Sequence, residues 1–146
     1  MKAEEILKHH DLKNTGCRKH IINELLNSEQ ALSENEIKTA VSNLFDRVTF
    51  YRSLKTLEEN KIIHRITLND GSVKYALSKE GRFSCGESCH CNQIHRHMHT
   101  HFHCTKCNEV LCIDAILENS VQLPEGFSVE SAQILLEGTC PQCKNS

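Results

Sequence analysis

Cysteine and histidine side chains, both common metal ligands, are concentrated in the second half of this sequence. The stretch from Cys85 to Cys112 contains six of the ten histidines and six of the nine cysteines. Two more cysteines, Cys140 and Cys143, follow near the C-terminus, whereas residues 1–80 contain one cysteine and four histidines. Because closely spaced cysteines in a reducing compartment are more typical of metal ligands than of disulfides, we expect metal chemistry here.

Two CxxC pairs give the most specific signal, Cys104-x-x-Cys107 and Cys140-x-x-Cys143. Four thiolates suit tetrahedral zinc, and a structural zinc site has all four positions filled by protein. Such a site would also tie the last strand to the first strands of a small domain. We therefore predict a structural zinc, with a redox dithiol or two unrelated pairs as the alternative.

A second set of donors alternates along the chain: His97, His99, His101 and His103. On a strand these imidazoles would point to one face. Cys112 follows on the neighbouring strand candidate, and Cys91 is one of several thiols just upstream. The set can supply three or four ligands to a second ion, and its alternative is a solvated histidine-rich loop.

The donor types in this second set bear on the identity of its ion. Imidazole with thiolate favours zinc, whereas sites for ferrous iron or manganese usually contain carboxylates. The nearest carboxylates are Glu87 and Asp114. We therefore favour Zn²⁺ over Fe²⁺ as the second divalent metal, and keep iron as the alternative because histidine-rich sites bind it too.

Zinc held by histidine and cysteine also occurs in hydrolases and deaminases, so an enzyme must be considered. A deaminase needs H-x-E with P-C-x-x-C, and a zinc protease needs H-E-x-x-H. The deaminase pattern is absent, since Pro141 lies inside the last CxxC pair and not before it, and the sequence contains no H-E-x-x-H. We expect no catalysis and no small-molecule substrate.

Helix signals occupy most of the first half. We expect a short helix over Ala3 to His10 and a second helix after Thr15, a candidate N-cap. The second helix has one apolar face, which carries Ile21, Ile22, Leu25 and Leu26. Ser33 to Glu36 fits a capping box, which predicts a helix that runs to about Val41.

A further helix is predicted after a turn, with Asp46 as its cap. Its buried side is expected to carry Val48, Phe50, Leu54 and Leu57. It also carries polar and cationic groups suited to base edges and phosphates, namely Thr49, Tyr51, Arg52 and Lys55. Exposed helices often carry such residues, so a purely structural surface remains the alternative to DNA binding.

Two extended runs follow, Ile62 to Leu68 and Ser72 to Leu77, joined by the turn sequence Asn69-Asp70-Gly71. Helices followed by such a hairpin are typical of a winged helix-turn-helix, in which the second helix of the pair enters the major groove. The alternative is a helical domain on which the hairpin only packs.

The second half of the sequence is expected to form shorter secondary-structure elements. Val110 to Ile113 is expected to form a strand, Ala115 to Val121 a short helix, and Phe127 to Leu136 a long strand. The apolar phase of the long strand changes between Val129 and Ile134, which a bulge or a change of packing partner would explain.

Charge is distributed unevenly between the two halves. The net charge is −2, with 13 basic and 12 acidic residues in 1–80 and 4 basic and 7 acidic in 81–146. Any contact with nucleic acid must therefore be a local patch. The N-terminus lacks a signal-peptide pattern and no segment approaches a membrane span, so we expect a cytoplasmic protein without a membrane partner.

Four motifs in this order resemble one known family. They are Leu12-Lys13-x-Thr15-x-x-Arg18, Val48-Thr49-Phe50-Tyr51-Arg52-Ser53-Leu54, His99-x-His101-x-x-Cys104-x-x-Cys107 and Gly138-x-Cys140-x-x-Cys143. They span nearly the whole chain. On these residues the chain is identified as a member of the ferric uptake regulators, a bacterial group of dimeric metal-dependent repressors.

The resemblance implies an α+β fold with an N-terminal winged helix-turn-helix DNA-binding domain and a small α/β dimerisation domain with a structural zinc. We place the DNA-binding domain at 1–80, a hinge with a metal-rich insertion at 81–96, and the dimerisation and metal-binding domain at 97–146. The implied partners are a second copy of the chain and a pseudo-palindromic double-stranded DNA operator. The implied DNA-binding residues are Lys13, Thr15, Arg18, Thr49, Tyr51, Arg52 and Lys55.

The resemblance also assigns the metal ligands. Cys104, Cys107, Cys140 and Cys143 correspond to the structural zinc site, and His99 and His101 to the sensory site. Iron-sensing relatives place a carboxylate where this chain has Cys112, and a family histidine is replaced within Glu29 to Leu32. These departures resemble the zinc-sensing branch, which uses an upstream cysteine such as Cys91, Cys89 or Cys85. The predicted sensory set is His99, His101, Cys112, Cys91 and His97.

We therefore expect a metal-responsive repressor that binds its operator as a homodimer when the sensory site is filled, and that controls metal uptake or homeostasis. Zinc is the favoured signal. The alternatives are an iron-sensing regulator of the same family, a zinc-buffering or storage protein, and a thiol redox sensor that uses Cys17, Cys85, Cys89 or Cys91.

Overall fold

The computed structural model describes residues 2–41, 43–78, 100–113, 123–128 and 133–146. The chain divides into two compact units, Met1–Glu87 and Ser88–Ser146, and the division falls inside the segment 81–96 predicted as a hinge. The predicted helix over Ala115 to Val121 lies outside the described residues. The same holds for three of the candidate sensory ligands, Cys91, His97 and His99.

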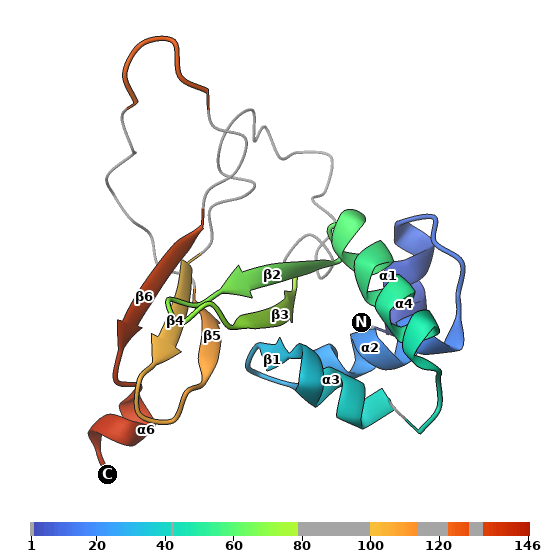
Figure 1. Ribbon diagram of the computed structural model, residues 1–146, viewed down its shortest axis with the longest axis horizontal. Helices are drawn as coiled ribbons and strands as arrows, with labels where there is room; N and C mark the ends of the chain where they lie inside the picture. The colour runs from blue at the N-terminus through green and yellow to red at the C-terminus, as the bar shows by residue number, and fades with distance from the viewer. Residues whose placement is uncertain (1, 42, 79–99, 114–122, 129–132) are drawn as a thin grey trace. The chain divides into compact units, whose positions relative to one another are not determined.

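The first unit contains the predicted helices, with bounds close to those expected (Figure 1). They are α1 (Ala3–His9), α2 (Gly16–Asn27), α3 (Glu34–Val41) and α4 (Arg47–Glu59). Their apolar faces meet in one core, which includes the fully buried side chains Leu7, Ile21, Ile22, Ile37 and Leu57. No helix in the described ranges is long and apolar enough to cross a membrane.

Local side-chain bonds fix where α3 and α4 begin. The Ser33 amide donates to Glu36 Oε2 at 2.7 Å and the Glu36 amide donates to Ser33 Oγ at 3.2 Å, which confirms the predicted capping box. The Thr49 amide donates to Asp46 Oδ1 at 2.9 Å, which confirms Asp46 as the cap of α4. The predicted N-cap position of Thr15 is also correct, although its side chain makes no capping bond.

The buried face of α4 differs from the prediction at one residue. Phe50, Leu54 and Leu57 are buried, but Val48 is 58% exposed, so its assignment to the core was wrong. Residues four and three apart share a helix face, whereas a residue two positions before Phe50 points to the opposite side. Val48 therefore lies on the solvent stripe that also carries Arg52.

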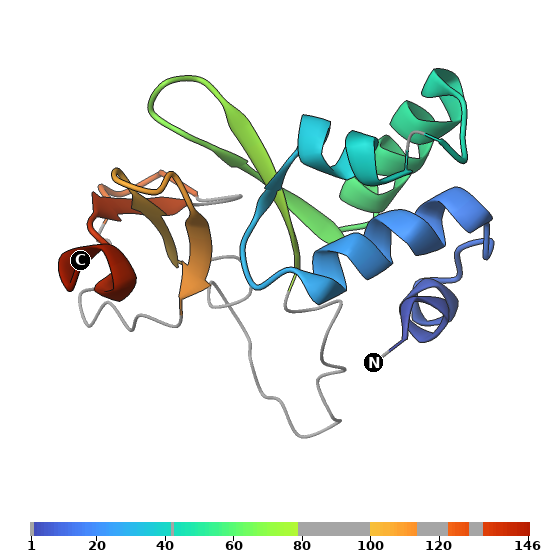
Figure 2. The same ribbon diagram turned by 90° about the horizontal axis from the view of Figure 1, so that it is seen from below.

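A small antiparallel sheet completes the first unit, with the order β1-β3-β2 (Figure 2). It comprises β1 (Leu32–Ser33), β2 (Ile63–Thr67) and β3 (Val73–Leu77). The predicted hairpin is confirmed, and Gly71 in its turn has a φ of 82°, a value that glycine adopts without strain. Strand β1 was not predicted, because two residues carry no periodicity.

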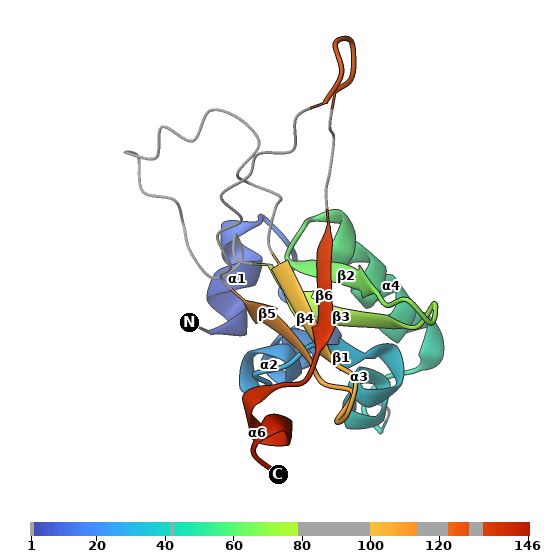
Figure 3. The ribbon, with the colours of Figure 1, turned by 90° about the vertical axis from the view of Figure 1, so that its left-hand side faces the viewer.

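The second unit has β4 (Thr100–Cys104) at the centre of a three-stranded sheet (Figure 3). Strand β5 (Val110–Ile113) pairs with it antiparallel, as expected for a hairpin partner, and β6 (Ile134–Gly138) pairs with it parallel. A short helix, α6 (Pro141–Lys144), follows β6. Proline at the first position of α6 suits a helix start, where its missing N–H leaves no bond unmade.

The predicted strand over Phe127 to Leu136 was wrong in its first part. Gly126 has a φ of 90° and the Phe127 amide donates to the Pro124 carbonyl at 3.3 Å, so this region turns. Among the described residues, strand β6 runs from Ile134 to Gly138, and its register partners on β4 run from Thr100 to Cys104. The apolar alternation of the sequence does not show which strand pairs with β6.

The burial pattern of α4 gives a test of its register. Replacing Leu57, which is 0% exposed, with alanine should lower the free energy of unfolding by about 2–5 kcal/mol, because the cavity cannot fully collapse. The matched change Val48→Ala on the same helix should alter it by less than about 0.5 kcal/mol. Urea denaturation followed by far-ultraviolet circular dichroism measures both. Equal losses in the two variants would contradict this register.

Candidate metal centre and recognition helix

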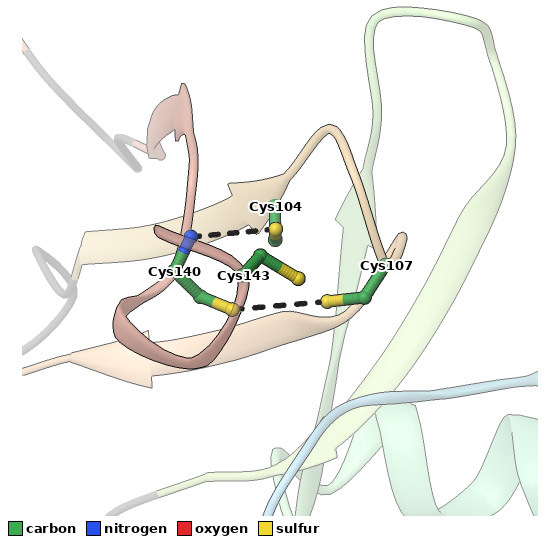
Figure 4. Close-up of side chains that lie close together, drawn as sticks. All are labelled: Cys104, Cys107, Cys140 and Cys143. Atoms are coloured by element: carbon green, nitrogen blue, oxygen red, sulfur yellow. Dashed lines mark hydrogen bonds between the residues drawn. The ribbon is translucent and has the colours of Figure 1, made fainter. Parts of the chain in front are cut away.

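The two CxxC pairs come together in the second unit (Figure 4). Cys104 ends β4 and Cys107 lies in the turn that follows, while Cys140 directly precedes α6 and Cys143 lies within it. The four sulfur atoms all lie within 4.8 Å of one another. Within this cluster, Cys107 Sγ lies 3.9 Å from Cys140 Sγ.

These separations fit a tetrahedral four-thiolate site. With zinc–sulfur bonds of about 2.3 Å, sulfur atoms at the corners of a tetrahedron lie roughly 3.8 Å apart. A disulfide requires about 2 Å, and all four cysteines are free. When bound, a zinc ion supplies no catalysis in such a closed site and acts as a cross-link between the two pairs.

Backbone amides and neighbouring thiols set different protonation preferences within the cluster. Amides of Cys107 and Cys140 point at Cys104 Sγ, the latter at 3.3 Å, and lower the pKa of Cys104 to about 6. Hydrogen bonding to the Cys140 thiol, followed by desolvation, raises the pKa of Cys143 to about 12. The Cys104 thiol is therefore easier to deprotonate than the Cys143 thiol, and the thiolate form is the one that binds a cation.

The pairing of β4 with β6 positions the cluster. Cys104 is the register partner of Gly138, and the Thr105 amide donates to the Gly138 carbonyl at 2.8 Å. A Cβ at Gly138 would lie 3.2 Å from the ring of Phe102, so glycine lets the two strands pack closely. At the preceding register pair of the same ladder, His103 Nδ1 lies 3.0 Å from Glu137 Oε1. These contacts place Cys140 two residues beyond the end of the shared register.

His101 and Cys112, two of the predicted sensory ligands, are cross-strand partners on β4 and β5. Cys112 Sγ lies 3.4 Å from His101 Nδ1, so one imidazole and one thiol face the same point. His101 and His103 share a strand face, as their alternation predicts. The remaining members of the predicted set, Cys91, His97 and His99, lie outside the described residues.

The predicted DNA-binding residues of α4 fall into two groups. Arg52 and Lys55 are exposed and share a stripe with Val48, and Lys55 Nζ lies 3.7 Å from Glu59 Oε1 on the same helix. Thr49 and Tyr51 are half-buried. Arg52 and Lys55 are thus the more exposed of the two groups.

Thr49 and Tyr51 instead make bonds within the first unit. Thr49 Oγ1 donates to Asp46 Oδ2 at 2.7 Å, which adds to the cap of α4. The Tyr51 hydroxyl donates to Glu34 Oε1 on α3 at 2.8 Å. The hydroxyl groups of both residues are therefore occupied by intramolecular partners.

The three predicted contacts before α4 lie just before or within the first turn of α2. Arg18 Nη1 donates to the Lys13 carbonyl at 3.0 Å and so shapes the segment that carries Lys13. Lys13 is exposed and Thr15 is half-buried. Lys13 is thus the member of this group whose charge faces solvent.

Two cations beside Tyr51 were not selected by sequence reasoning. Arg47 Cζ lies 5.6 Å and Lys38 Nζ 5.7 Å from the centroid of the Tyr51 ring. Arg47 could have been noticed, because it lies four residues before Tyr51 on a predicted helix. Lys38 belongs to a different helix, so its proximity depends on tertiary packing.

A helix-turn-helix unit with a hairpin wing, followed by a sheet that carries a four-cysteine cluster, defines a metal-responsive transcription regulator. The model of the ferric uptake regulator family matches residues 9–136. The chain belongs to this family, whose members are transcription regulators and not enzymes. It is 28% identical to the ferric uptake regulation protein of Bacillus subtilis (strain 168) over 126 residues, 82% of this chain and 76% of that protein.

Solved structures share the fold. The ferric uptake regulator of Helicobacter pylori, described as having three functional metal binding sites, gives a TM-score of 0.61 at 18% identity, with 100% of this chain and 96% of that chain covered. A zinc uptake regulator complexed with zinc and DNA gives 0.65 at 19% identity, with 98% and 91% covered. The predicted α+β fold is thereby confirmed.

The cysteine cluster predicts a specific loss of metal. Cys143→Ser should remove one tightly held zinc per chain, because a hydroxyl is a much weaker zinc ligand than a thiolate. Cys112→Ser, which leaves all four clustered sulfur atoms in place, is the matched control and should retain that zinc after brief exposure to a chelator. Atomic spectroscopy of the purified variants measures the content. Equal zinc content in Cys143→Ser and the wild type would contradict the assignment.

Proposed function

We propose that this protein is a repressor that binds a pseudo-palindromic double-stranded DNA operator as a homodimer when its sensory site holds a divalent metal, with zinc as the sensed ion. It would control the uptake or homeostasis of that metal. The observation that carries the metal preference is the His101–Cys112 pair, in which a thiol faces an imidazole at 3.4 Å.

The DNA-binding part of the proposal rests on α4. Arg52 and Lys55 are exposed on one stripe of the second helix of a helix-turn-helix pair, the element that enters the major groove in this class of domain. Arginine suits guanine edges, and lysine suits phosphates. Val48, 58% exposed on the same stripe, adds an apolar group that suits a thymine methyl.

The choice of zinc rests on donor softness. A thiolate beside an imidazole favours zinc over ferrous iron or manganese, which prefer more oxygen ligands. We propose that His101 and Cys112 are joined by His99 and by donors among Cys91 and His97. The four-cysteine cluster would hold a second, permanent zinc, so that each chain carries two ions with different roles.

Dimer formation is supported by the surface of the second unit. Strand β6 is an edge of the described sheet, and Leu136 on it is 39% exposed. Phe127 and Leu123 are 69% and 44% exposed. Paired copies would cover such apolar side chains and satisfy an open strand edge. Two recognition helices would then read two half-sites related by two-fold symmetry.

The proposed switch is a shift in population. Filling the sensory site favours the arrangement of the dimer in which both α4 helices match successive half-sites, and disfavours unproductive ones. A 100-fold gain in operator affinity requires that the metal stabilise the DNA-binding arrangement over the others by about 2.7 kcal/mol. The coupling free energy of one metal site can reach this value.

The test compares operator binding at controlled free metal. A duplex selected by the metal-loaded protein from a random-sequence pool serves as the probe, and fluorescence anisotropy reports binding. Protein that retains its structural zinc should bind this duplex roughly 100-fold more tightly when zinc fills the sensory site. Titrations with Fe²⁺ and Mn²⁺ under anaerobic conditions show which ion acts at the lowest free concentration.

Three outcomes count against the proposal. Equal affinity with and without sensory metal would remove the metal switch, and a lower threshold for Fe²⁺ than for Zn²⁺ would make the protein an iron sensor. Failure of the wild type to select any duplex would favour a zinc-buffering protein.

A thiol redox sensor that uses Cys17 lacks support, because Cys17 is 1% exposed and burial raises its pKa.

Changing the donor opposite His101 should change the metal preference. Cys112→Asp replaces a soft thiolate with the harder oxygen ligand that ferrous iron prefers. We expect the zinc concentration needed for operator binding to rise by at least about tenfold relative to that for Fe²⁺, with the structural zinc retained. Cys112→Ser serves as the control for loss of the thiolate alone. An unchanged zinc-to-iron ratio in Cys112→Asp would exclude Cys112 from the sensory site.

A further inference from the structure

Tyr51 lies at the centre of a cluster that links α3 to α4. Its hydroxyl donates to Glu34 Oε1 at 2.8 Å in a partly buried bond, and this bond raises the pKa of Tyr51. Its ring packs edge-on against Phe50 and borders the hydrophobic core. The side chain is thus held at both its polar and its apolar end.

Two cations border the same ring from different helices. Arg47, in the first turn of α4, has its Cζ 5.6 Å from the ring centroid, and Lys38 on α3 has its Nζ at 5.7 Å. Both separations are within the range of cation–π attraction, which is about 6 Å. Arg47 is exposed, so its guanidinium borders the ring while it remains open to solvent.

This arrangement is unsuited to a hydroxyl that reads bases. To donate to a base edge, Tyr51 would have to give up a hydrogen bond to a carboxylate, which is stronger than a neutral one. It would also leave the Glu34 carboxylate without the Tyr51 hydroxyl as its donor. A carboxylate without that donor would repel the phosphates of bound DNA. The cations beside the ring, by contrast, have the charge to meet a phosphate, and Arg47 is exposed.

We propose that Arg47 is a further DNA-contacting residue, and that Tyr51 is a positioning residue whose ring holds Arg47 and Lys38 toward the DNA backbone while Glu34 holds the ring. This proposal rests on the DNA-binding function proposed above. Operator preference would then come from the exposed stripe of α4 that carries Arg52, and the Tyr51 cluster would supply register and affinity.

A double-mutant cycle tests the coupling. Zinc-loaded, full-length protein is titrated with two duplexes of equal length, one selected from a random pool by the wild type and one of mixed sequence, at several salt concentrations. The variants are Arg47→Ala, Tyr51→Ala, Tyr51→Phe and the double variant Arg47→Ala/Tyr51→Ala. Lys144→Ala, which removes an exposed charge from α6, is the matched control.

The expected pattern is specific to positioning. Arg47→Ala should weaken binding to both duplexes about 3- to 10-fold and reduce the slope of log affinity against log salt by roughly one, as loss of one phosphate contact does. Tyr51→Ala should do the same, and the double variant should be less than about twofold weaker than either, because neighbours that act together are not additive. Tyr51→Phe keeps the ring and should preserve the slope and the preference for the selected duplex. Lys144→Ala should change neither.

Two results would overturn the proposal. Loss of preference for the selected duplex in Tyr51→Phe would mean that the hydroxyl reads bases. Additive losses in the double variant would mean that Tyr51 does not act through Arg47. Circular dichroism and zinc content of each variant exclude misfolding as the cause, and Tyr51→Phe provides the comparison if Tyr51→Ala fails to fold. Failure of the wild type to bind either duplex would instead refute the proposed function itself.

Discussion

The second unit depends on one piece of backbone pairing, the parallel ladder between β4 and β6. Its register partners run from Thr100 with Ile134 to Cys104 with Gly138. Because Cys104 is the last residue of β4 and Cys140 follows Gly138 by two positions, this ladder brings the two CxxC pairs to the same end of the sheet. The same central strand carries His101, whose partner across the other ladder is Cys112. One strand thus sets the geometry of both groups of donors.

The first unit is organised differently. Capping residues determine where its helices begin, and a tertiary hydrogen bond holds α3 against α4. The capping box at Ser33 and Glu36 starts α3, and Asp46 starts α4. Tyr51 and Glu34 then join the two helices across 17 positions of sequence. Because the same Tyr51 ring borders two cations, the packing of the pair and the charge it presents are not independent. A change that loosens the pair also moves the charges.

Sequence reasoning succeeded where a signal was local. Capping residues and apolar spacing located the starts of the four helices and the bounds of the β2–β3 hairpin to within about a residue, and cysteine spacing selected the four sulfurs that the structure brings together. It failed where the outcome depended on a distant partner. Nothing around Ile134 shows that its parallel register partner is Thr100, and nothing around Tyr51 shows that Glu34 accepts its hydroxyl hydrogen bond. Val48 was misplaced because apolar character was taken for burial, although its phase on α4 places it in solvent.

The parallel ladder also determines where the chain does not tolerate changes in length. Successive side chains along a strand alternate between the two faces of the sheet, so a shift of one residue moves every following side chain to the other face. One residue inserted within β4 or β6 would therefore turn the following side chains to the opposite face and separate Cys104 from Cys140.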